Sequence, residues 1–137
     1  MNIDSIRNGY VIDHIEAGKG MKIYRLLKLE NFGCSVAMIM NAQSNKMGKK
    51  DVIKIDSDTP LDMHILGYVD PNITVNVIKD SVIVEKKKIE LPEKLTDIIF
   101  CKNPRCITST EQELSHVFTL ADRGRRIYRC IYCDAEG

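Results

Sequence analysis

Four of the chain's five cysteines form two close pairs near the C-terminus. Cys101 and Cys106 are spaced C-x4-C, and Cys130 and Cys133 are spaced C-x2-C, with 23 residues between the pairs. This pattern is typical of zinc-ribbon and rubredoxin-like modules, because each pair can supply two thiolates from one tight turn. Four thiolates leave no open coordination position, so the sequence predicts one structural Zn²⁺ ion, although iron could take the same ligands.

Other uses of these thiols fit the surrounding sequence less well. Two disulfides would require an oxidising compartment, and residues 1–15 lack the basic start and continuous apolar core of a secretory signal, so we expect a cytoplasmic protein with reduced thiols. A redox-active C-x2-C would require a βαβ pattern, which does not surround Cys133. We interpret His116 as a strand residue rather than a ligand, and Cys34, at the start of the apolar run 34–40, as a buried inert thiol.

The elements that carry the cysteine pairs are expected to form a small domain of their own. Pro92 follows the basic run 86–88 and would interrupt a strand, so we place a boundary there and expect domains at 1–92 and 93–137. The second segment is near the size at which a hydrophobic core alone rarely suffices. Ligation by four thiolates can contribute about 10–16 kcal/mol of apparent folding free energy. We therefore predict a small all-β zinc-ribbon or rubredoxin-like domain that unfolds when its metal is removed.

Hydrophobic patterning predicts that the first domain is α+β. Strands are expected at 10–15, 34–40, 51–56, 73–78 and 82–86, and helices at 21–29 and 59–68. The 34–40 strand is continuously apolar, so we expect it to be buried and to form a hairpin with 51–56. The order β-α-β-β-α-β with one added strand is the ferredoxin-like arrangement, an antiparallel sheet with two helices on one face.

Composition and charge exclude several classes of protein. The 137 residues are 44% hydrophobic and 28% charged, with a formal net charge of +1. A net charge this small gives the whole chain no general electrostatic attraction to nucleic acid or to an anionic membrane. No stretch approaches the roughly 20 apolar residues of a membrane span. A nucleic-acid-binding zinc ribbon is the alternative, because arginines cluster at 123–129, but equal numbers of basic and acidic side chains lie in 97–137. A stand-alone enzyme lacks any catalytic motif.

Basic side chains at strand ends are the remaining candidates for ligand contacts. Lys54 belongs to the expected third strand, Lys49 and Lys50 directly precede it, and the run 86–88 ends the last strand. Such lysines can solubilise a sheet edge or together hold a polyanion such as a triphosphate, and composition leaves both readings open. The dipeptide at 13–14, Asp-His, is expected to point to opposite faces of its strand and so not to act as a dyad.

Several segments together resemble the regulatory chain of aspartate carbamoyltransferase, in order and over nearly the whole chain. They are VIDHI at 11–15, MGKKDVIKI at 47–55, TVN at 74–76, LPE at 91–93, and the cysteine motifs at 101–106 and 130–133. The resemblance implies a non-catalytic allosteric subunit whose first domain binds the nucleoside triphosphates CTP and ATP. It implies that the zinc domain docks on the separate catalytic chain, in pyrimidine biosynthesis, and that the regulatory chain forms homodimers within a larger hetero-oligomer.

The same resemblance implies roles for individual residues. Asp13 would accept hydrogen bonds from the sugar beside His14, Lys54 and Lys86 would contact sugar or phosphate, and Asn76 would approach the nucleotide. The base pocket would be formed by Ile3, Asp4, Ile6, Val11, Ile78 and Ile83. 

Two further positions follow from the resemblance. Asn103, inside the first cysteine pair, is the expected contact with the catalytic chain. Ser81 stands at a pocket position where the family can carry an aromatic residue, and the segment 134–137 after the last cysteine is short for the family. The resemblance therefore leaves open which base the pocket prefers. It also leaves open whether a strand after the last cysteine contacts the catalytic chain.

Overall fold

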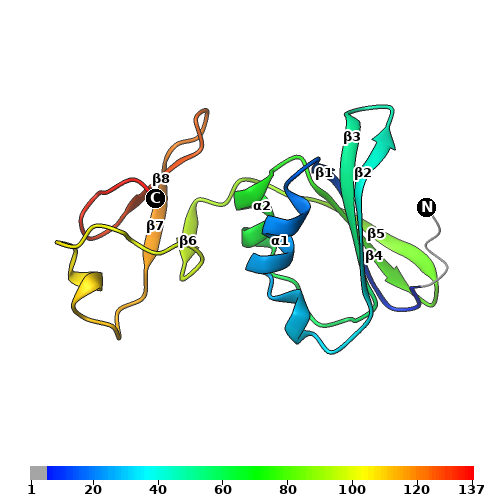
Figure 1. Cartoon of the computed structure of the whole chain (residues 1–137), viewed down its shortest axis with the longest axis horizontal. Coiled ribbons are helices and arrows are strands. Elements are labelled where there is room, and N and C mark those ends of the chain that lie inside the picture. The colour runs from blue at the N-terminus through cyan, green and yellow to red at the C-terminus, as the bar shows by residue number, and fades with distance from the viewer. Residues whose placement is uncertain (1–5) are drawn as a thin grey trace. The chain divides into compact units, whose positions relative to one another are not determined.

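The computed structural model describes residues 6–137 and divides the chain into two compact units, Met1–Glu90 and Leu91–Gly137 (Figure 1). Within the described residues, no helix has both the length and the apolar character that a membrane span would require.

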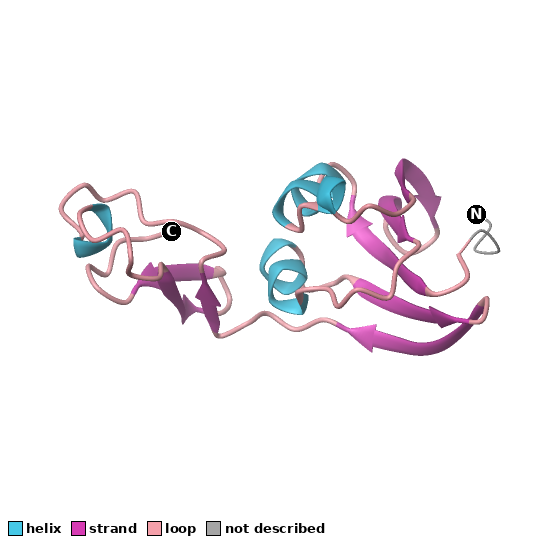
Figure 2. Cartoon of the chain, turned by 90° about the horizontal axis from the view of Figure 1, so that it is seen from below, coloured by secondary structure: helices cyan, strands magenta, loops and turns pink. Residues whose placement is uncertain are grey.

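The first unit is an antiparallel five-stranded sheet with its helices on one face (Figures 1 and 2). The strands lie in the order β2-β3-β1-β4-β5, which is the ferredoxin-like arrangement with one added edge strand, as the sequence predicts. Its elements are β1 (Gly9–Glu16), α1 (Gly20–Leu26), a 3-10 helix η1 (Leu29–Asn31), β2 (Val36–Ser44), β3 (Gly48–Ile55), α2 (Met63–Val69), β4 (Thr74–Lys79) and β5 (Val82–Lys88).

Apolar side chains fill the space between the sheet and the two helices. Ile12 and Ile53 from the sheet and Ile23 and Leu66 from the helices are fully buried in one cluster. A smaller cluster lies on the other face of the sheet, which carries no helix, and we call that face the open face. Its buried members are Ile6, Val11, Val52 and Ile78.

A bulge interrupts β1 at residues 13–14. Ile12 pairs with Ile53 whereas Ile15 pairs with Asp51, so β1 carries one more residue than β3 over this stretch, and His14 has a φ of 59°. The extra residue allows both isoleucines of β1 to reach the same core. The strict alternation on which the sequence-based prediction for the Asp-His dipeptide relied is therefore broken at this point.

Three sequence-based predictions of local structure are corrected. The strand expected at 34–40 is shifted to β2, which is an edge strand and only partly buried. Met40 is 54% exposed, and Cys34, which precedes β2 in the sequence, is half-buried rather than buried. Helix α1 ends three residues early, because Lys28 adopts a left-handed conformation. Helix α2 begins at Met63, not at residue 59, because the Asp62 carboxylate caps it by accepting the N–H groups of the second and third residues that follow.

The second unit is a small antiparallel sheet of three strands in the order β6-β7-β8. Phe118 and Tyr128 are buried at its centre, and the Tyr128 hydroxyl donates a hydrogen bond to the Pro92 carbonyl. The last residues fold back along β8, where the backbone of Glu136 forms an isolated antiparallel β-bridge with that of Arg129. The elements are β6 (Lys94–Thr96), a 3-10 helix η2 (Ile107–Ser109), β7 (Val117–Asp122) and β8 (Ile127–Cys130).

Candidate metal centre and ligand-binding face

The four cysteines of the sequence motif converge in the second unit. Cys101 Sγ lies 3.5 Å from Cys133 Sγ, Cys106 Sγ lies 3.8 Å from Cys130 Sγ, and all four sulfur atoms are within 4.8 Å of one another. A tetrahedral zinc ion with Zn–S bonds of about 2.3 Å spaces its sulfurs by about 3.8 Å, which these distances match. A disulfide needs sulfurs about 2.0 Å apart, and all four thiols are free. The geometry therefore fits one metal ion and not two disulfides.

Tight turns and side-chain hydrogen bonds hold the thiols in place. The Cys106 N–H donates to the Asn103 carbonyl at 3.0 Å, and the Asp134 N–H donates to the Cys130 carbonyl at 2.9 Å. The hydroxyl of Thr108, which is 4% exposed, donates to Cys106 Sγ at 3.1 Å. These contacts keep the sulfurs at ligating distance and support the thiolate form of Cys106.

His116 takes part in the site without being a ligand. It lies just before β7 and not within it, and its Nδ1 accepts the Cys101 N–H at 3.1 Å. Its ring packs edge-on against Phe100, with centroids 4.9 Å apart. His116 thus orients the first cysteine loop, a role that the sequence pattern did not indicate.

The thiol pKa values explain why the cluster needs a cation. A hydrogen bond from the Ala135 backbone N–H lowers the pKa of Cys133 to about 7, and the Thr108 hydroxyl lowers the pKa of Cys106. Burial, reinforced by the neighbouring thiols, raises the pKa of Cys101 to about 12. Four adjacent thiolates are thus unfavourable near neutral pH by themselves, and a divalent ion would offset their repulsion.

On the open face of the first unit, strand register brings four of the predicted nucleotide-site residues into one row. Val11 pairs with Lys54 on β3 and with Asn76 on β4, and Asn76 pairs with Lys86 on β5. Directly paired residues of antiparallel strands point to the same face. These positions are far apart in the sequence, and the row Lys54–Val11–Asn76–Lys86 runs across four adjacent strands.

The apolar residues predicted for the base pocket lie next to this row where the structure describes them. Ile78 pairs with Ile83, and a register shift after Val77 keeps Ile83 on the same face as Lys86. Ile6 is buried against Val11 and Ile78. A cavity of about 250 Å³ is lined by Ile6 and Lys54. Ile3 and Asp4, which were also predicted, lie outside the described residues.

Asp13 follows the row on β1 and forms an ion pair with Lys50, which the sequence analysis considered only as a possible contact for a polyanion. Lys50 Nζ lies 2.9 Å from Asp13 Oδ1, and both side chains are at most one-fifth exposed. Burial by itself raises the pKa of Asp13, but hydrogen bonds from Lys50 and from the His14 backbone N–H outweigh it, so that the pKa lies below its ordinary value. Asp13 is therefore held as a carboxylate, a hydrogen-bond acceptor at neutral pH.

Two buried polar atoms, one in the row and one next to Asp13 in sequence, have no hydrogen-bond partner among the described residues. They are His14 Nδ1 and Asn76 Oδ1. Buried polar side-chain atoms without a partner are uncommon in native proteins and call for an explanation, which a bound ligand can supply. Together with the lysines, the ionised Asp13 and the apolar cluster, they make the open face the candidate site for a ligand that has cation-binding, hydrogen-bonding and apolar parts.

These features define a two-unit, metal-binding protein with convergent polar groups on an open sheet face, and comparison with known proteins specifies its family. Residues 1–90 match the model of the allosteric domain of the aspartate carbamoyltransferase regulatory chain, and residues 93–136 match its metal binding domain. The regulatory chain of Clostridium botulinum (strain Hall) is 52% identical over 98% of this chain and 92% of its own length. The regulatory chains of Clostridium tetani and Bifidobacterium longum are 52% and 43% identical, over 98% and 99% of this chain and 94% and 98% of their own lengths.

The chain therefore belongs to the family of aspartate carbamoyltransferase regulatory chains, and it is a non-catalytic regulatory subunit with an allosteric domain and a metal-binding domain.

Proposed function

We propose that the first unit binds CTP and ATP on its open face, and that the second unit docks on the catalytic chain of aspartate carbamoyltransferase and so regulates pyrimidine biosynthesis. The observation that carries the nucleotide proposal is the row Lys54–Val11–Asn76–Lys86, together with Asp13 and two unpartnered buried polar atoms, Asn76 Oδ1 in the row and His14 Nδ1 next to Asp13 in sequence. Charge-assisted contacts from lysines suit a triphosphate, and an ionised carboxylate suits ribose hydroxyls.

Each part of a nucleotide has a matching group on this face. Lys86 would hold the phosphates and Lys54 the sugar or phosphate, while Asp13, fixed by Lys50, would accept from the sugar. The Asn76 Oδ1 and His14 Nδ1 would receive their missing partners from the ligand. The base would lie on the apolar cluster of Ile6, Val11, Ile78 and Ile83, with Ile3 and Asp4 as further expected contacts.

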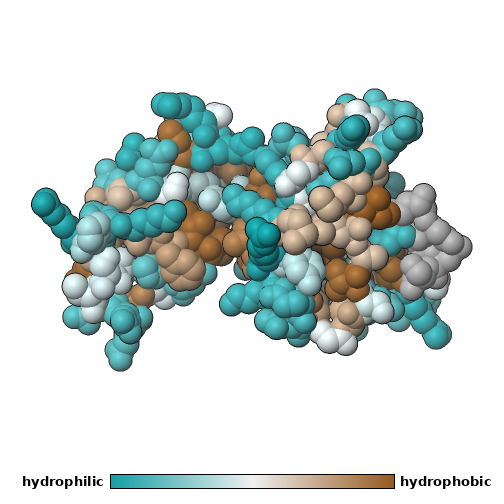
Figure 3. Space-filling view, in the orientation of Figure 1, coloured by the Kyte–Doolittle hydropathy of each residue, from teal (hydrophilic) through white to brown (hydrophobic). Residues whose placement is uncertain are grey.

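The surface around the metal centre supports the docking proposal. Each cysteine ligand is next in sequence to an exposed apolar residue. These are Phe100 (58% exposed), Ile107 (49%), Ile131 (49%) and Tyr132 (45%), which we call the apolar rim. Apolar surface is visible on the second unit among polar side chains (Figure 3). An apolar rim fixed by a rigid metal centre suits the buried part of a protein–protein interface.

Asn103, the predicted interface residue, is partly buried and also shapes the first cysteine turn. Its carbonyl accepts from Cys106 N–H and from the Ser109 hydroxyl, and its side-chain oxygen accepts the Arg105 N–H at 3.1 Å. We retain it as a contact with the catalytic chain at the edge of the apolar rim. A substitution there would disturb both the turn and the interface.

Two arginines of the basic cluster are already engaged within the second unit, which weakens the nucleic-acid alternative. Arg123 forms an ion pair with Glu93 at 3.0 Å, and Arg129 donates to the Asp134 carbonyl at 3.1 Å. We further propose that the chain forms homodimers within a larger hetero-oligomer in the cytoplasm, a compartment that keeps its free thiols reduced.

Co-expression with the catalytic chain tests the proposal. We expect a complex that contains one zinc ion per regulatory chain and whose carbamoyl aspartate synthesis changes when CTP or ATP is added. An effector can act at a distance only if it binds two states of the assembly with different affinity, typically by about 1–3 kcal/mol. A complex that forms but ignores both nucleotides would refute the allosteric part, and failure of the zinc-loaded chain to associate would refute the docking part.

A further inference from the structure

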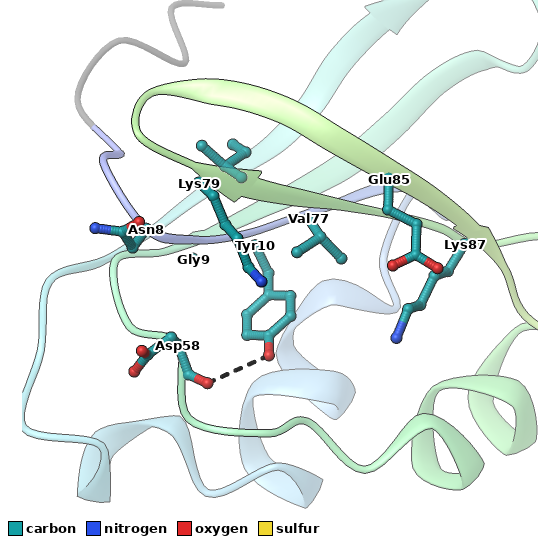
Figure 4. Close-up of a pocket in the computed structure, with 9 residues that line it drawn as sticks. Asn8, Gly9, Tyr10, Asp58, Val77, Lys79, Glu85 and Lys87 are labelled. Atoms are coloured by element: carbon teal, nitrogen blue, oxygen red, sulfur yellow. Dashed lines mark hydrogen bonds between the residues drawn. The ribbon is translucent and has the colours of Figure 1, made fainter.

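A second cavity lies on the helix side of the first unit's sheet, away from the open face. Its volume of about 510 Å³ falls in the range of small-molecule sites, about 300–1,000 Å³. Tyr10 and Val77 line its floor, and Lys79, Glu85 and Lys87 project around it from β4 and β5 (Figure 4). None of these side chains has a role in the nucleotide site proposed above.

The charged side chains around this cavity do not neutralise one another. Lys79 and Lys87 contribute two ammonium groups, and Glu85 and Asp58 contribute two carboxylates. In the part of the chain that the structure describes, the ion pairs join other residues, on β1 and β3, at the start of α1, and in the second unit. The cavity therefore offers unpaired charges of both signs with no net charge.

The floor of the cavity adds an apolar surface and one hydroxyl group. Tyr10 and Val77 are directly paired across β1 and β4, so their side chains lie next to each other. The Tyr10 hydroxyl donates to the Asp58 carbonyl at 3.5 Å, as the dashed line in Figure 4 shows, and its oxygen can still accept a hydrogen bond.

We propose that this cavity binds a small zwitterion of the α-amino acid class, with its carboxylate against Lys87, its ammonium group against Glu85, and its side chain on Tyr10 and Val77. A ligand with only a negative charge would be repelled by the two carboxylates of the lining. A ligand with only a positive charge would be repelled by the two lysines. Only a ligand that carries both charges complements the lining as a whole.

Strand alternation makes the proposal separable from the nucleotide site. Lys86 faces the open face, paired with Asn76, whereas its neighbour Lys87 lines the cavity on the other side of the same strand. A substitution at one lysine therefore alters one face and leaves the other in place.

Nuclear magnetic resonance titration of the full zinc-loaded chain tests the proposal. The probes are L-leucine, L-glutamate and L-lysine, with acetate and methylammonium as ligands of a single charge. We expect at least one amino acid to shift the amide signals of Tyr10, Val77 and Lys87 saturably, with a Kd in the range of about 1 mM. The proposal is overturned if none of the three amino acids gives saturable shifts at about 10 mM, or if acetate alone binds equally well.

Three variants locate the site. Glu85→Gln and Lys87→Met should each raise the Kd about three- to fivefold, as expected for the loss of one exposed ion pair, and the double variant should abolish saturation. Lys86→Met is the matched control and should leave amino acid binding unchanged. Unaltered affinity in the double variant would place the binding elsewhere and refute the proposal. Because these titrations contain no nucleotide, failure to bind CTP would count against the proposed function alone.

Discussion

Lys50 on β3 and Asp13 at the β1 bulge form an ion pair 2.9 Å long across two adjacent strands. The pair lies beside the row of residues that we propose to hold a nucleotide, two residues beyond Val11 along β1, and it keeps the Asp13 carboxyl ionised and in a fixed position.

Replacing Lys50 with Met should raise the pKa of Asp13, because burial then acts without its main compensating hydrogen bond. The lowered pKa of Asp13 means that the pair stabilises the fold above the unfolded-state pKa and that this contribution is lost as the pH falls through the folded-state pKa. In the variant the loss should be small, about 1 kcal/mol or less at neutral pH.

Carbon-detected nuclear magnetic resonance titration of Asp13 measures the pKa, and urea unfolding between pH 3 and pH 7 measures the stability. Lys49→Met, one residue away and exposed, is the control. An unchanged pKa of Asp13 in the Lys50 variant would show that the ion pair does not govern its ionisation.

Replacing Lys86 with Ala should weaken the binding of CTP and ATP by about tenfold or more, because one charge-assisted contact with phosphate contributes about 1.5–3 kcal/mol. Association with the catalytic chain should be unaffected, since Lys86 lies in the first unit and the docking surface that we propose lies in the second. Isothermal titration calorimetry measures both. Lys87→Ala, on the other face of β5, is the matched control, and equal nucleotide affinity in the two variants would remove Lys86 from the site.

Replacing Cys133 with Ser should release the metal and unfold the second unit, because three thiolates remain where four are needed to hold a structural ion. The first unit should keep its fold, as it has a core of its own. Atomic absorption measures bound zinc, and size-exclusion chromatography with the catalytic chain measures association. Cys34→Ser, outside the cluster, is the control, and zinc retained at full stoichiometry in the Cys133 variant would contradict the assignment.

Replacing Thr108 with Val should weaken metal binding about 10- to 100-fold while leaving the fold intact, because the hydroxyl that supports the Cys106 thiolate is replaced by a methyl group of the same shape. The hydroxyl lowers the pKa of Cys106, so without it protons compete better for the sulfur and metal release should begin at a higher pH. Competition with a chelator across a pH series detects the change. Thr110→Val, whose hydroxyl donates to a backbone carbonyl, is the control.

Replacing Ile131 with Ser should weaken association with the catalytic chain by about 1–3 kcal/mol without loss of zinc, because the apolar rim would lose one of its exposed side chains while the cysteine ligands stay in place. Surface plasmon resonance with immobilised catalytic chain measures the affinity. Val84→Ser, an exposed apolar residue of the first unit, serves as control. If the Ile131 variant binds as tightly as the native chain, the rim is not the docking surface.

The features that the sequence predicted well are those that depend on local spacing. The two cysteine pairs indicate a metal site because two thiolates from one short turn can meet a single ion, and in the structure the four sulfurs do converge. Alternation around Val52 and Ile53 similarly identifies β3 and its hairpin partner β2. The prediction that the 34–40 strand is buried was wrong, because apolar character does not tell an edge strand from a central one.

The sequence by itself determined the number and type of the main elements of the first unit and the identity of the metal ligands, since patterning, caps and cysteine spacing are properties of short segments. Only the tertiary structure decided which side chains share a face. The bulge at His14, the row from Lys54 to Lys86, the Lys50–Asp13 pair and the separation of Lys86 from Lys87 all depend on strand register. Register is fixed by how whole strands pair and pack, because a shift of one residue would carry every side chain of a strand to the other face.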